Sequence, residues 1–505
     1  MNRVFQHLKR WTSHQDKAWC FPVLLALLAF AITLINALRS AYPIGYAGLY
    51  TLMFEGIAEN GLRLPATLPY YNLQPIPFAY PPLPFYVAAI ITQVFGISSL
   101  AYLRFIPIPL AVGCGLAFYF LLVEIVKDPR IAALGGVLFL SMPEIAHYDF
   151  SAAGMVRGLA LLFLLLFWLF FWRTFYTAET RRRESWLAGL FLALTGLSHL
   201  SYLLFAGFGV VLMAVFSDRA WKQKAVHLLR VGLVALVLLS PWLVHILSRW
   251  GFDILIAPLA SHDNLQLSQG LLYVLRIANL NPPWIMALFL VAFLHALTHQ
   301  RWLWVSWFLL TLVGFGESDR FLLLLLIVMA AEFLVFWLEK IPAETDLKPQ
   351  QRWIPLGVIA LAVIGLAIPN YITLFRQQQA SLTDEFIEMG TWLKENTPQD
   401  AEVLYIESDP ALSEWLPYFS HRVPETGHWG TEWLGSYAEE SEQQFLVRGI
   451  AVNEDNELLV ESMRHFGWDP EFTVLPKKSE LTTQYLEHTK TIVFENEEYL
   501  VVEMP

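Results

Sequence analysis

Apolar segments long enough to cross a membrane recur through this sequence, and they constrain the fold more than any other feature. Phe21–Leu38 and Gly158–Trp172 are two of these segments. A helix of roughly 20 apolar residues spans the hydrocarbon core of a bilayer. Only 15% of the 505 residues are charged, whereas soluble domains contain about a quarter. The sequence therefore predicts a polytopic α-helical membrane protein.

The distribution of charge divides the chain into two parts. From Gln379 to the end there are 26 Asp and Glu but only 7 Lys and Arg, so that 18 acids and 26 bases precede this point. Such a change of sign, where span-length apolar segments also stop, predicts a domain boundary. We expect a transmembrane domain over residues 1–378 and a small acidic α/β domain over residues 379–505. The acidic balance argues against nucleic acid as a partner.

The positive-inside rule predicts the topology. Four bases place the N-terminus in the cytoplasm: Arg3, Lys9, Arg10 and Lys17. The first span, about Ala18–Leu38, is interpreted as a retained anchor, because no small-residue cleavage site follows a short apolar core. Residues 39–98 then form a long first outer loop. Within it, Leu83–Phe95 is short for a span and suits an interfacial helix.

With that assignment, the later apolar segments bring the total to about eleven spans and leave the acidic tail outside the plasma membrane. The ten later spans are predicted at Leu100–Val126, Ile131–Ala146, Gly154–Trp172, Glu184–Leu197, Leu200–Phe216, Ala225–Leu247, Trp284–Leu297, Trp302–Gly316, Phe321–Leu338 and Ile354–Phe375. Treating Leu83–Phe95 as a span would invert every later loop and place the basic segment at residues 180–183 outside.

The acidic tail alternates helix and strand patterns. A helix is expected from Ser381, which forms a start resembling a capping box with Asp384. Residues 401–408 have the pattern of a strand, and residues 490–505 that of a hairpin that turns at Asn496–Glu498. About 125 residues of mixed helix and strand can bury a modest core.

Charged residues gather at the predicted outer ends of two spans. Asp149 and Arg157 are eight residues apart. If Asp149 caps the following helix, both lie on roughly the same face, with the carboxylate in water and Arg157 reaching the headgroup layer. A guanidinium there can bind a phosphate through two hydrogen bonds. Alternatively, Arg157 extends toward the interface and Asp149 only neutralises it.

A second group of charges, Glu317, Asp319 and Arg320, precedes another predicted span. These residues are either ordinary loop charges or, together with Arg157, one site for an anionic lipid headgroup. His199, between two spans at the outer surface, is either a turn residue or a donor to the same phosphate. In the tail, the aromatic residues Trp415, Trp429 and Trp433, with Glu432, form either a sugar-stacking surface or the core of the small domain.

The chain resembles the GT-C superfamily of membrane glycosyltransferases over nearly its whole length. The resemblance rests on the proline-rich entry to Leu83–Phe95, on "RIAALGGVLFLSMPEIAHYDF", and on the exterior C-terminal domain. "SAAGMVRGLALLFLLL", "GLSHLSYLLFAGF" and "EWLPYFSHRVPETGHWGTEWLG" are similar to a branch of uncharacterised membrane proteins labelled as related to 6-pyruvoyl-tetrahydropterin synthase. That label is not interpreted as a function.

The resemblance implies that a sugar moves from a polyprenyl-phosphate donor to an acceptor on the outer face. It also implies a general base in the first outer loop, near Tyr46, and a helper acid in the second loop. No Asp or Glu stands between Arg39 and Phe54, so the sequence departs from the pattern here. The nearest carboxylates, Glu55 and Glu59, lie about three helical turns later.

Two functional interpretations stay open. In the first, Arg320 and Arg157 bind the donor phosphate, with Asp319, Glu59 and His199 beside them, while Glu55 deprotonates the acceptor. Asp149 then orients the acceptor or a divalent cation, the one cofactor considered. In the second, the missing early acid marks a non-catalytic, lipid-binding component of surface polysaccharide assembly. A transporter ranks last, because the charges lie at the rim and no interrupted helices are paired. Donor sugar, acceptor and oligomeric state are left open.

Overall fold

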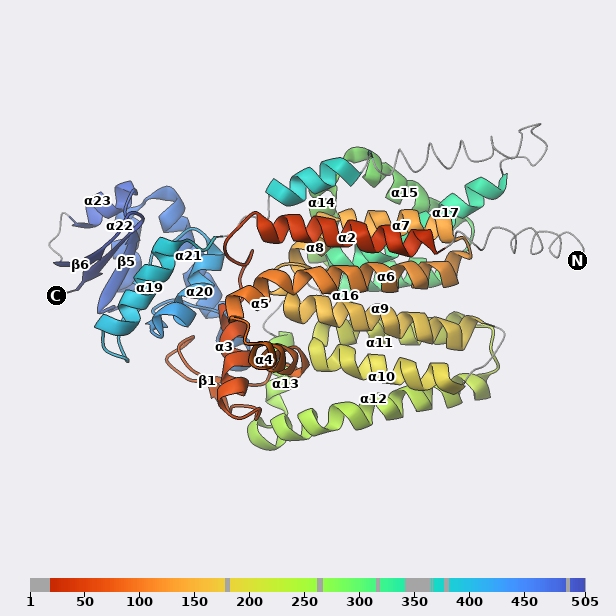
Figure 1. Cartoon of the computed structure of the whole chain (residues 1–505), viewed down its shortest axis with the longest axis horizontal. Coiled ribbons are helices and arrows are strands. Elements are labelled where there is room, and N and C mark those ends of the chain that lie inside the picture. The colour runs from red at the N-terminus through yellow and green to blue at the C-terminus, as the bar shows by residue number, and fades with distance from the viewer. Residues whose placement is uncertain are drawn as a thin grey trace, which may run out of the picture.

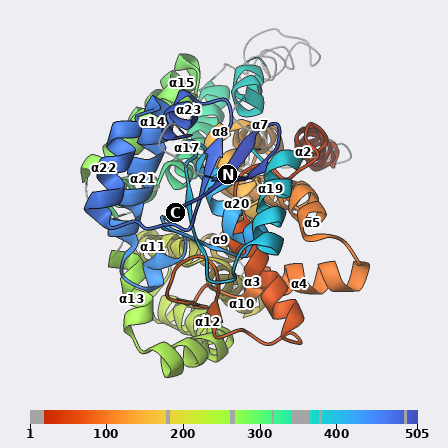
Figure 2. The ribbon, with the colours of Figure 1, turned by 90° about the vertical axis from the view of Figure 1, so that its left-hand side faces the viewer.

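The computed structural model describes residues 19–177, 182–260, 267–314, 318–340, 365, 367–376, 381–486 and 491–504. A bundle of long helices runs along the long axis of the molecule, and a smaller α/β part lies at one end (Figure 1). Seen from that end, the C-terminal sheet and its helices lie in front of the bundle (Figure 2). The first outer loop lies between these two parts.

The helices of the bundle are mostly the predicted apolar segments. Their bounds are α2 Cys20–Leu38, α5 Ser99–Phe105, α6 Pro107–Val126, α7 Pro129–Ser141, α8 Pro143–Asp149, α9 Gly154–Tyr176, α10 Arg182–Ser198, α11 Leu200–Phe216, α12 Trp221–Trp250, α14 Leu267–Leu280, α15 Pro283–Thr298, α16 Trp302–Gly314 and α17 Asp319–Lys340. One large apolar core fills the space between them, with contributions from α2, α6, α9, α11, α16 and α17.

Within the described residues, five helices are long and apolar enough to span a membrane, or six if one bent pair counts as a single span. A further group of apolar helices has only 10–17 residues. The chain is therefore a polytopic helical membrane protein, whereas the count of eleven stays a prediction. The expected last span, Ile354–Phe375, lies mostly outside the described residues, as does Glu317.

The bent pair consists of α7 and α8, which meet at an angle of 64°. Pro143 is the first residue of α8, and Met142 before it has extended backbone with ψ of 117°. A residue that precedes proline is driven out of the helical region, and the proline nitrogen has no hydrogen to donate. The predicted straight span Ile131–Ala146 is therefore two helices, and α8 turns Tyr148 and Asp149 back over the bundle.

The first outer loop contains two helices, α3 (Gly48–Glu59) and α4 (Leu83–Phe95), and a short antiparallel pair, β1 (Thr67–Leu68) and β2 (Ile76–Pro77). The bounds of α4 are those expected for the interfacial helix. It ends at Gly96, whose φ of +62° is a left-handed conformation that glycine adopts without strain. Helix α13 (Asp253–Ala260) follows α12 at the same end of the bundle (Figure 1).

The C-terminal part has a five-stranded mixed sheet in the order β4-β3-β5-β7-β6. Its strands are β3 Glu402–Tyr405, β4 Val423–Pro424, β5 Phe472–Pro476, β6 Thr491–Glu495 and β7 Tyr499–Glu503. Its helices are α19 Asp384–Asn396, α20 Pro410–Ser420, η3 Thr431–Trp433, α21 Tyr437–Asn453, α22 Asn456–Phe466 and α23 Glu480–Leu486. The predicted hairpin is confirmed as the antiparallel pair β6–β7.

The start of α19 differs from the prediction. Thr383, not Ser381, is the N-cap, and its side chain accepts a hydrogen bond of 3.1 Å from the backbone N–H of Phe386. An N-cap side chain accepts the backbone N–H two or three positions later, a condition that Thr383 meets. The predicted domain boundary, between residues 378 and 379, falls outside the described residues and stays a prediction.

The first outer loop and the C-terminal part share one hydrophobic core. Phe54 and Phe85, from α3 and α4, are buried in the same cluster as Phe386 and Trp415, from α19 and α20. The indole N–H of Trp415 also donates a hydrogen bond of 3.0 Å to the carbonyl of Gly45. The C-terminal part is thus packed onto the first outer loop over a continuous apolar interface.

Candidate functional site

Three arginines from different helices surround the ring of Tyr148. Arg157, Arg276 and Arg320 have their guanidinium carbons 5.5, 5.3 and 5.0 Å from the ring centroid. The guanidinium of Arg276 also donates a hydrogen bond of 2.8 Å to the Tyr148 hydroxyl. Guanidinium groups are attracted to the negative face of an aromatic ring. One residue at the end of α8 therefore gathers cations from α9, α14 and α17.

Two fully buried carboxylates accompany these arginines. Asp149 accepts a hydrogen bond from the hydroxyl of Tyr202, on α11. Asp319, the first residue of α17, lies 3.6 Å from the Nε atom of Arg276. Both carboxylates have an exposed fraction of 0%, and Arg320 is only 3% exposed. Buried charges are retained only where opposite charges or hydrogen bonds compensate them, as these groups do for one another.

Two glycines of α9 position the end of α8. A Cβ atom at Gly154 would lie 2.4 Å from the carbonyl oxygen of Asp149, and one at Gly158 only 2.3 Å from it. The two glycines are four residues apart, so they lie on the same face of α9. This face lets the backbone of Asp149 approach the helix more closely than any larger residue permits. The GMVRG segment (Gly154–Gly158) therefore determines where Tyr148 and Asp149 lie.

A buried amide network lies on the far side of α8. Glu144 accepts a hydrogen bond of 2.7 Å from the side chain of Asn281, which in turn accepts one of 2.9 Å from Asn370. Residues far apart in the sequence are thereby fixed relative to α8. The second carboxylate oxygen of Glu144 is buried with no hydrogen-bond partner among the described residues.

The first outer loop forms one wall of the site. Arg157 donates a hydrogen bond of 2.9 Å to the hydroxyl of Tyr46, whose ring packs against Trp429 of the C-terminal part at a centroid distance of 5.1 Å. The backbone N–H of Ala152 donates to the carbonyl of Ile44 at 2.9 Å. These contacts join the loop before α3 to the turn between α8 and α9.

A second set of aromatic contacts crosses the site through His199. Its ring packs against Tyr80 and Tyr202 at centroid distances of 5.7 and 5.3 Å. Its Nδ1 atom accepts the N–H of Ser201 at 3.2 Å and so caps α11. Burial, aided by the nearby charges of Arg157 and Arg320, holds the pKa of His199 well below its usual 6.5. A neutral imidazole therefore stands beside the two guanidinium groups.

The structure thus brings together five of the seven residues that we expected at the site: Asp149, Arg157, His199, Asp319 and Arg320. Glu55 lies elsewhere, at the contact between the first outer loop and the C-terminal part. Its Oε1 atom accepts hydrogen bonds from Ser99 at 2.5 Å and from Tyr418 at 3.0 Å. Glu59 is exposed at the end of α3.

The expected environment of Asp149 is wrong in two respects. Asp149 does not cap α9, whose N-cap is Ala153, because α8 continues to Asp149 and a turn separates the two helices. Its carboxylate is buried and not in water. The bend at Pro143, which the periodicity of the apolar segment does not reveal, is the physical reason.

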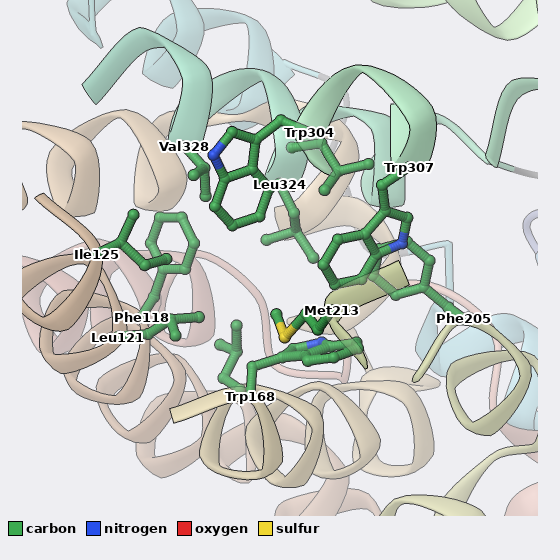
Figure 3. A pocket seen from close by; sticks show the side chains of 12 residues that line it. Phe118, Leu121, Ile125, Trp168, Phe205, Met213, Trp304, Trp307, Leu324 and Val328 are labelled. Atoms are coloured by element: carbon green, nitrogen blue, oxygen red, sulfur yellow. The ribbon is translucent and has the colours of Figure 1, made fainter. Parts of the chain in front are cut away.

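A small hollow of about 30 Å³ lies within the bundle, lined by apolar and aromatic side chains from α6, α9, α11, α16 and α17. Figure 3 shows Trp168, Trp304 and Trp307 around it, with Phe205 and Met213 on the side of α11. Phe205 stacks on Phe321 at a centroid distance of 4.5 Å. The guanidinium of Arg320 lies 5.0 Å from that same ring of Phe321. Aromatic contacts therefore connect the hollow with the arginine cluster.

Three side chains that organise the site were not among the residues expected there. Tyr148 directly precedes the predicted site residue Asp149, and this position could have indicated a role in the site. A tyrosine at a helix end has many other roles, however, so the position alone does not identify it. Arg276 and Tyr202 carry no local motif, and only the fold brings them to α8. Within the described residues, no group of three or more His, Cys, Asp or Glu side chains is arranged to hold a metal ion.

A family model matches residues 79–382, well over half of the chain. Its description is "6-pyruvoyl-tetrahydropterin synthase related domain; membrane protein". The chain belongs to this family. The match includes every arginine of the cluster, α8 and the GMVRG segment. A search of curated proteins finds no match to the chain.

Solved structures that share the fold are GT-C glycosyltransferases. ArnT from Cupriavidus metallidurans bound to undecaprenyl phosphate is 12% identical, with a TM-score of 0.58, covering 96% of this chain and 98% of ArnT. Its apo state gives 13% identity, a TM-score of 0.59 and the same coverage. Arabinofuranosyltransferase AftD from Mycobacteria gives 13% identity and a TM-score of 0.54, over 96% of this chain and 40% of AftD. At these identities the likeness establishes the fold alone.

Proposed function

We propose that the chain is a membrane glycosyltransferase that transfers a sugar from a polyprenyl-phosphate donor to an acceptor at the outer face of the membrane. The arginine cluster around Tyr148 carries the proposal. Guanidinium groups match phosphate oxygens in pairs, and three of them meet at one ring. When the sugar is transferred, the lipid phosphate leaves with additional negative charge, which positioned cations stabilise.

The apolar surroundings of the arginine cluster favour a lipid-linked donor over a free sugar phosphate. Phe321 lies beside the guanidinium of Arg320 and stacks on Phe205 within the apolar core of the bundle. A polyprenyl phosphate has a charged head and an apolar tail, and the two parts need adjacent environments of this kind. Undecaprenyl phosphate is the molecule bound in the ArnT structure of the same fold.

For the topology, we propose a cytoplasmic N-terminus, about eleven spans and a C-terminal part outside the plasma membrane. The bundle ends that point away from the α/β part carry Lys127, Arg130, Arg173 and Lys222, near the ends of α6, α7, α9 and α12 (Figure 1). Basic residues near span ends favour the cytoplasmic side. The arginine cluster lies toward the opposite end, which supports a transfer on the outer face.

Binding of undecaprenyl phosphate to the purified full-length protein tests this function. We expect Arg157→Ala and Arg320→Ala each to weaken binding at least tenfold, measured by native mass spectrometry in detergent. Arg249→Ala is the matched control, because Arg249 is an exposed arginine at the end of α12. Failure of the wild-type protein to bind the lipid, or equal binding by all three variants, would contradict the proposal.

A second candidate function, lipid binding without catalysis, is favoured by one observation. Glu55 was expected to be the base, but Ser99 and Tyr418 hydrogen-bond its carboxylate at a packing interface. The two functions differ in turnover. Release of polyprenyl phosphate from a panel of polyprenyl-phosphate pentoses and hexoses supports the transferase, whereas binding without release supports the second candidate.

A further inference from the structure

A carboxylate outside the arginine cluster lies in the C-terminal part, beside the first outer loop. Glu432 belongs to η3, a single turn between α20 and α21. Its Oε2 atom is buried and has no hydrogen-bond partner among the described residues. The indole N–H of Trp429, three residues earlier, is likewise buried without a partner there. Leaving a buried donor and a buried acceptor unsatisfied is costly, and a hydroxyl ligand can satisfy both kinds of group.

The segment that carries these groups is fixed against the first outer loop. Gly430 has a φ of +84°, a conformation that side chains disfavour. A Cβ atom there would lie 2.7 Å from Ile76 of β2. The conformation favours glycine, and a side chain there would displace that of Ile76. Trp433 in addition packs with Ala79 and the ends of α12 and α13. Glu432 is thus held rigidly at the junction of loop, bundle and C-terminal part.

Two aromatic paths join this segment to the arginine cluster. On one side, Trp429 packs on Tyr46, whose hydroxyl accepts a hydrogen bond from Arg157. On the other side, Trp433 packs on Tyr80 at a centroid distance of 5.6 Å, and Tyr80 contacts His199. Glu432 stands in the sequence between the two tryptophans. The segment therefore borders the site from both of its flanks.

The pKa shifts of Tyr80 and Glu432 agree with a position of Glu432 beside the site. Burial raises the pKa of Tyr80 to about 12, Arg157 opposes this rise, and Glu432 adds to it. The pKa of Tyr80 therefore responds to the charges of both Arg157 and Glu432. Burial raises the pKa of Glu432 to about 7, although backbone N–H groups of Glu432 and Gly430 favour its charged form. A carboxylate with a pKa near the working pH suits proton transfer.

We propose that Glu432 binds the acceptor hydroxyl and takes its proton, supplying from the C-terminal part the carboxylate that is missing between Arg39 and Phe54. The inference rests on the proposed transferase function. The acceptor oxygen forms a bond to the anomeric carbon of the sugar, while the bond from that carbon to the phosphate oxygen breaks. The electron pair of the broken bond leaves with the polyprenyl phosphate, and the hydroxyl proton passes to Glu432. Trp429 and Trp433 provide flat surfaces against which the acceptor packs.

Glu414 is a useful contrast, because it contacts the start of α3, next to the position where the first-loop acid was expected. Its two carboxylate oxygens each accept a hydrogen bond of 2.6 Å, from the backbone N–H groups of Gly48 and Leu49. The carboxylate is fully occupied as a cap of α3. Glu414 therefore serves the packing of the loop, and Glu432 keeps an oxygen available for an acceptor.

The test compares three carboxylate variants in the full-length protein. We expect Glu432→Gln to lower kcat for release of polyprenyl phosphate from a polyprenyl-phosphate pentose or hexose at least 100-fold, in line with loss of a general base. The dissociation constant for undecaprenyl phosphate should stay within twofold of wild type. Glu442→Gln, at an exposed position of α21, should change neither quantity. Glu55→Gln should change kcat less than threefold.

The pH profile provides a second readout. A base must be ionised, so wild-type kcat/KM should fall as the pH drops below about 7, and this limb should be absent from Glu432→Gln. The other acidic residues on helices that pack against η3 are Asp253 of α13 and Glu439, Glu440 and Glu442 of α21. Variants of these four residues should keep the limb.

A readout independent of turnover is labelling by dicyclohexylcarbodiimide, which reacts with protonated carboxyl groups in apolar surroundings. Glu432 should be labelled at pH 6 at least fivefold more than at pH 8.5, and Glu442 weakly at both. Equal kcat in Glu432→Gln and Glu442→Gln, or no preferential labelling of Glu432, overturns the assignment. Failure of the wild-type protein to bind undecaprenyl phosphate would instead overturn the transferase function itself.

Discussion

At the scale of single residues, Tyr148 organises the site through its ring. Three guanidinium carbons lie 5.0–5.5 Å from its centroid, and Arg276 also donates a hydrogen bond to its hydroxyl. Cation–π contacts contribute roughly 0.5–2 kcal/mol each, depending on burial. The ring therefore keeps three like charges together without neutralising them, as a carboxylate would.

Two substitutions at Tyr148 separate the contribution of the ring from that of the hydroxyl. Tyr148→Phe keeps the ring, so we expect the dissociation constant for undecaprenyl phosphate to rise less than threefold. Tyr148→Leu removes the ring, and we expect a rise of tenfold or more. Native mass spectrometry of both variants measures the effect. Equal losses in the two variants would mean that the hydroxyl, not the ring, holds the arginines.

At the scale of elements, the close packing of α8 on α9 determines where the end of α8, with Tyr148 and Asp149, lies. Gly154 and Gly158 bring the carbonyl of Asp149 against α9, and Pro143 bends α8 away from α7 by 64°. The apolar length of both helices was predictable from the sequence. The bend and the crossing were not, because they depend on contacts between segments that hydropathy treats independently.

Gly158→Ala tests this crossing. A Cβ atom at Gly158 would lie 2.3 Å from the carbonyl oxygen of Asp149, so the helices must separate. Overpacking of this kind costs about 1–3 kcal/mol, and we expect a lower Tm in detergent together with weaker binding of undecaprenyl phosphate. Gly207→Ala on α11 is the matched control, since no atom lies within 4 Å of a Cβ atom there. A similar Tm in both variants would contradict the role of the close approach.

The first turn of α3 depends on a cap from a distant part of the chain. Glu414→Ala would leave the N–H groups of Gly48 and Leu49 buried without their acceptor, at about 1–3 kcal/mol for each. We expect faster hydrogen exchange at residues 48–51 and a lower Tm. Glu442→Ala, at an exposed position, should alter neither. Unchanged exchange in Glu414→Ala would show that α3 is held by its apolar face alone.

At the scale of the whole molecule, the C-terminal part borders the candidate site, whereas the charge distribution suggested only a separate acidic domain. The sequence predicted the sheet hairpin, the helical bundle and five residues of the candidate site, because these follow from local patterns and from the order of spans. It did not reveal that Glu432 and Trp429 border the site or that Glu55 lies in a packing interface. Those positions result from contacts over more than 350 residues, which no local pattern encodes.

Stability of the whole molecule should also depend on pH through the C-terminal part. Burial and the neighbouring carboxyl of Glu402 raise the pKa of Glu425 to about 7. Because this value exceeds the 4.5 of an unperturbed glutamate, the folded state favours the protonated form. The stabilisation is complete below about pH 4.5 and is lost as the pH rises through 7. We expect Tm to decrease between pH 5 and pH 8.

Glu425→Gln isolates this contribution. The amide donates permanently to Glu402, so the decrease in Tm between pH 5 and pH 8 should be smaller than in the wild-type protein. Glu442→Gln should retain the wild-type decrease, because that residue is exposed. Thermal unfolding in detergent across the pH range measures both. The same decrease of Tm with pH in the wild-type protein and in Glu425→Gln would rule out a proton shared between the carboxyl groups of Glu425 and Glu402.

The core shared by the first outer loop and the C-terminal part has a consequence for biosynthesis. Phe54 and Phe85 are synthesised early, yet their partners Phe386 and Trp415 emerge from the ribosome more than 300 residues later. Until then the loop exposes apolar surface that it cannot bury by itself. Nascent chains should therefore need a chaperone or the lipid surface to shield this segment, and prematurely terminated chains should be degraded even when every helix of the bundle has been inserted.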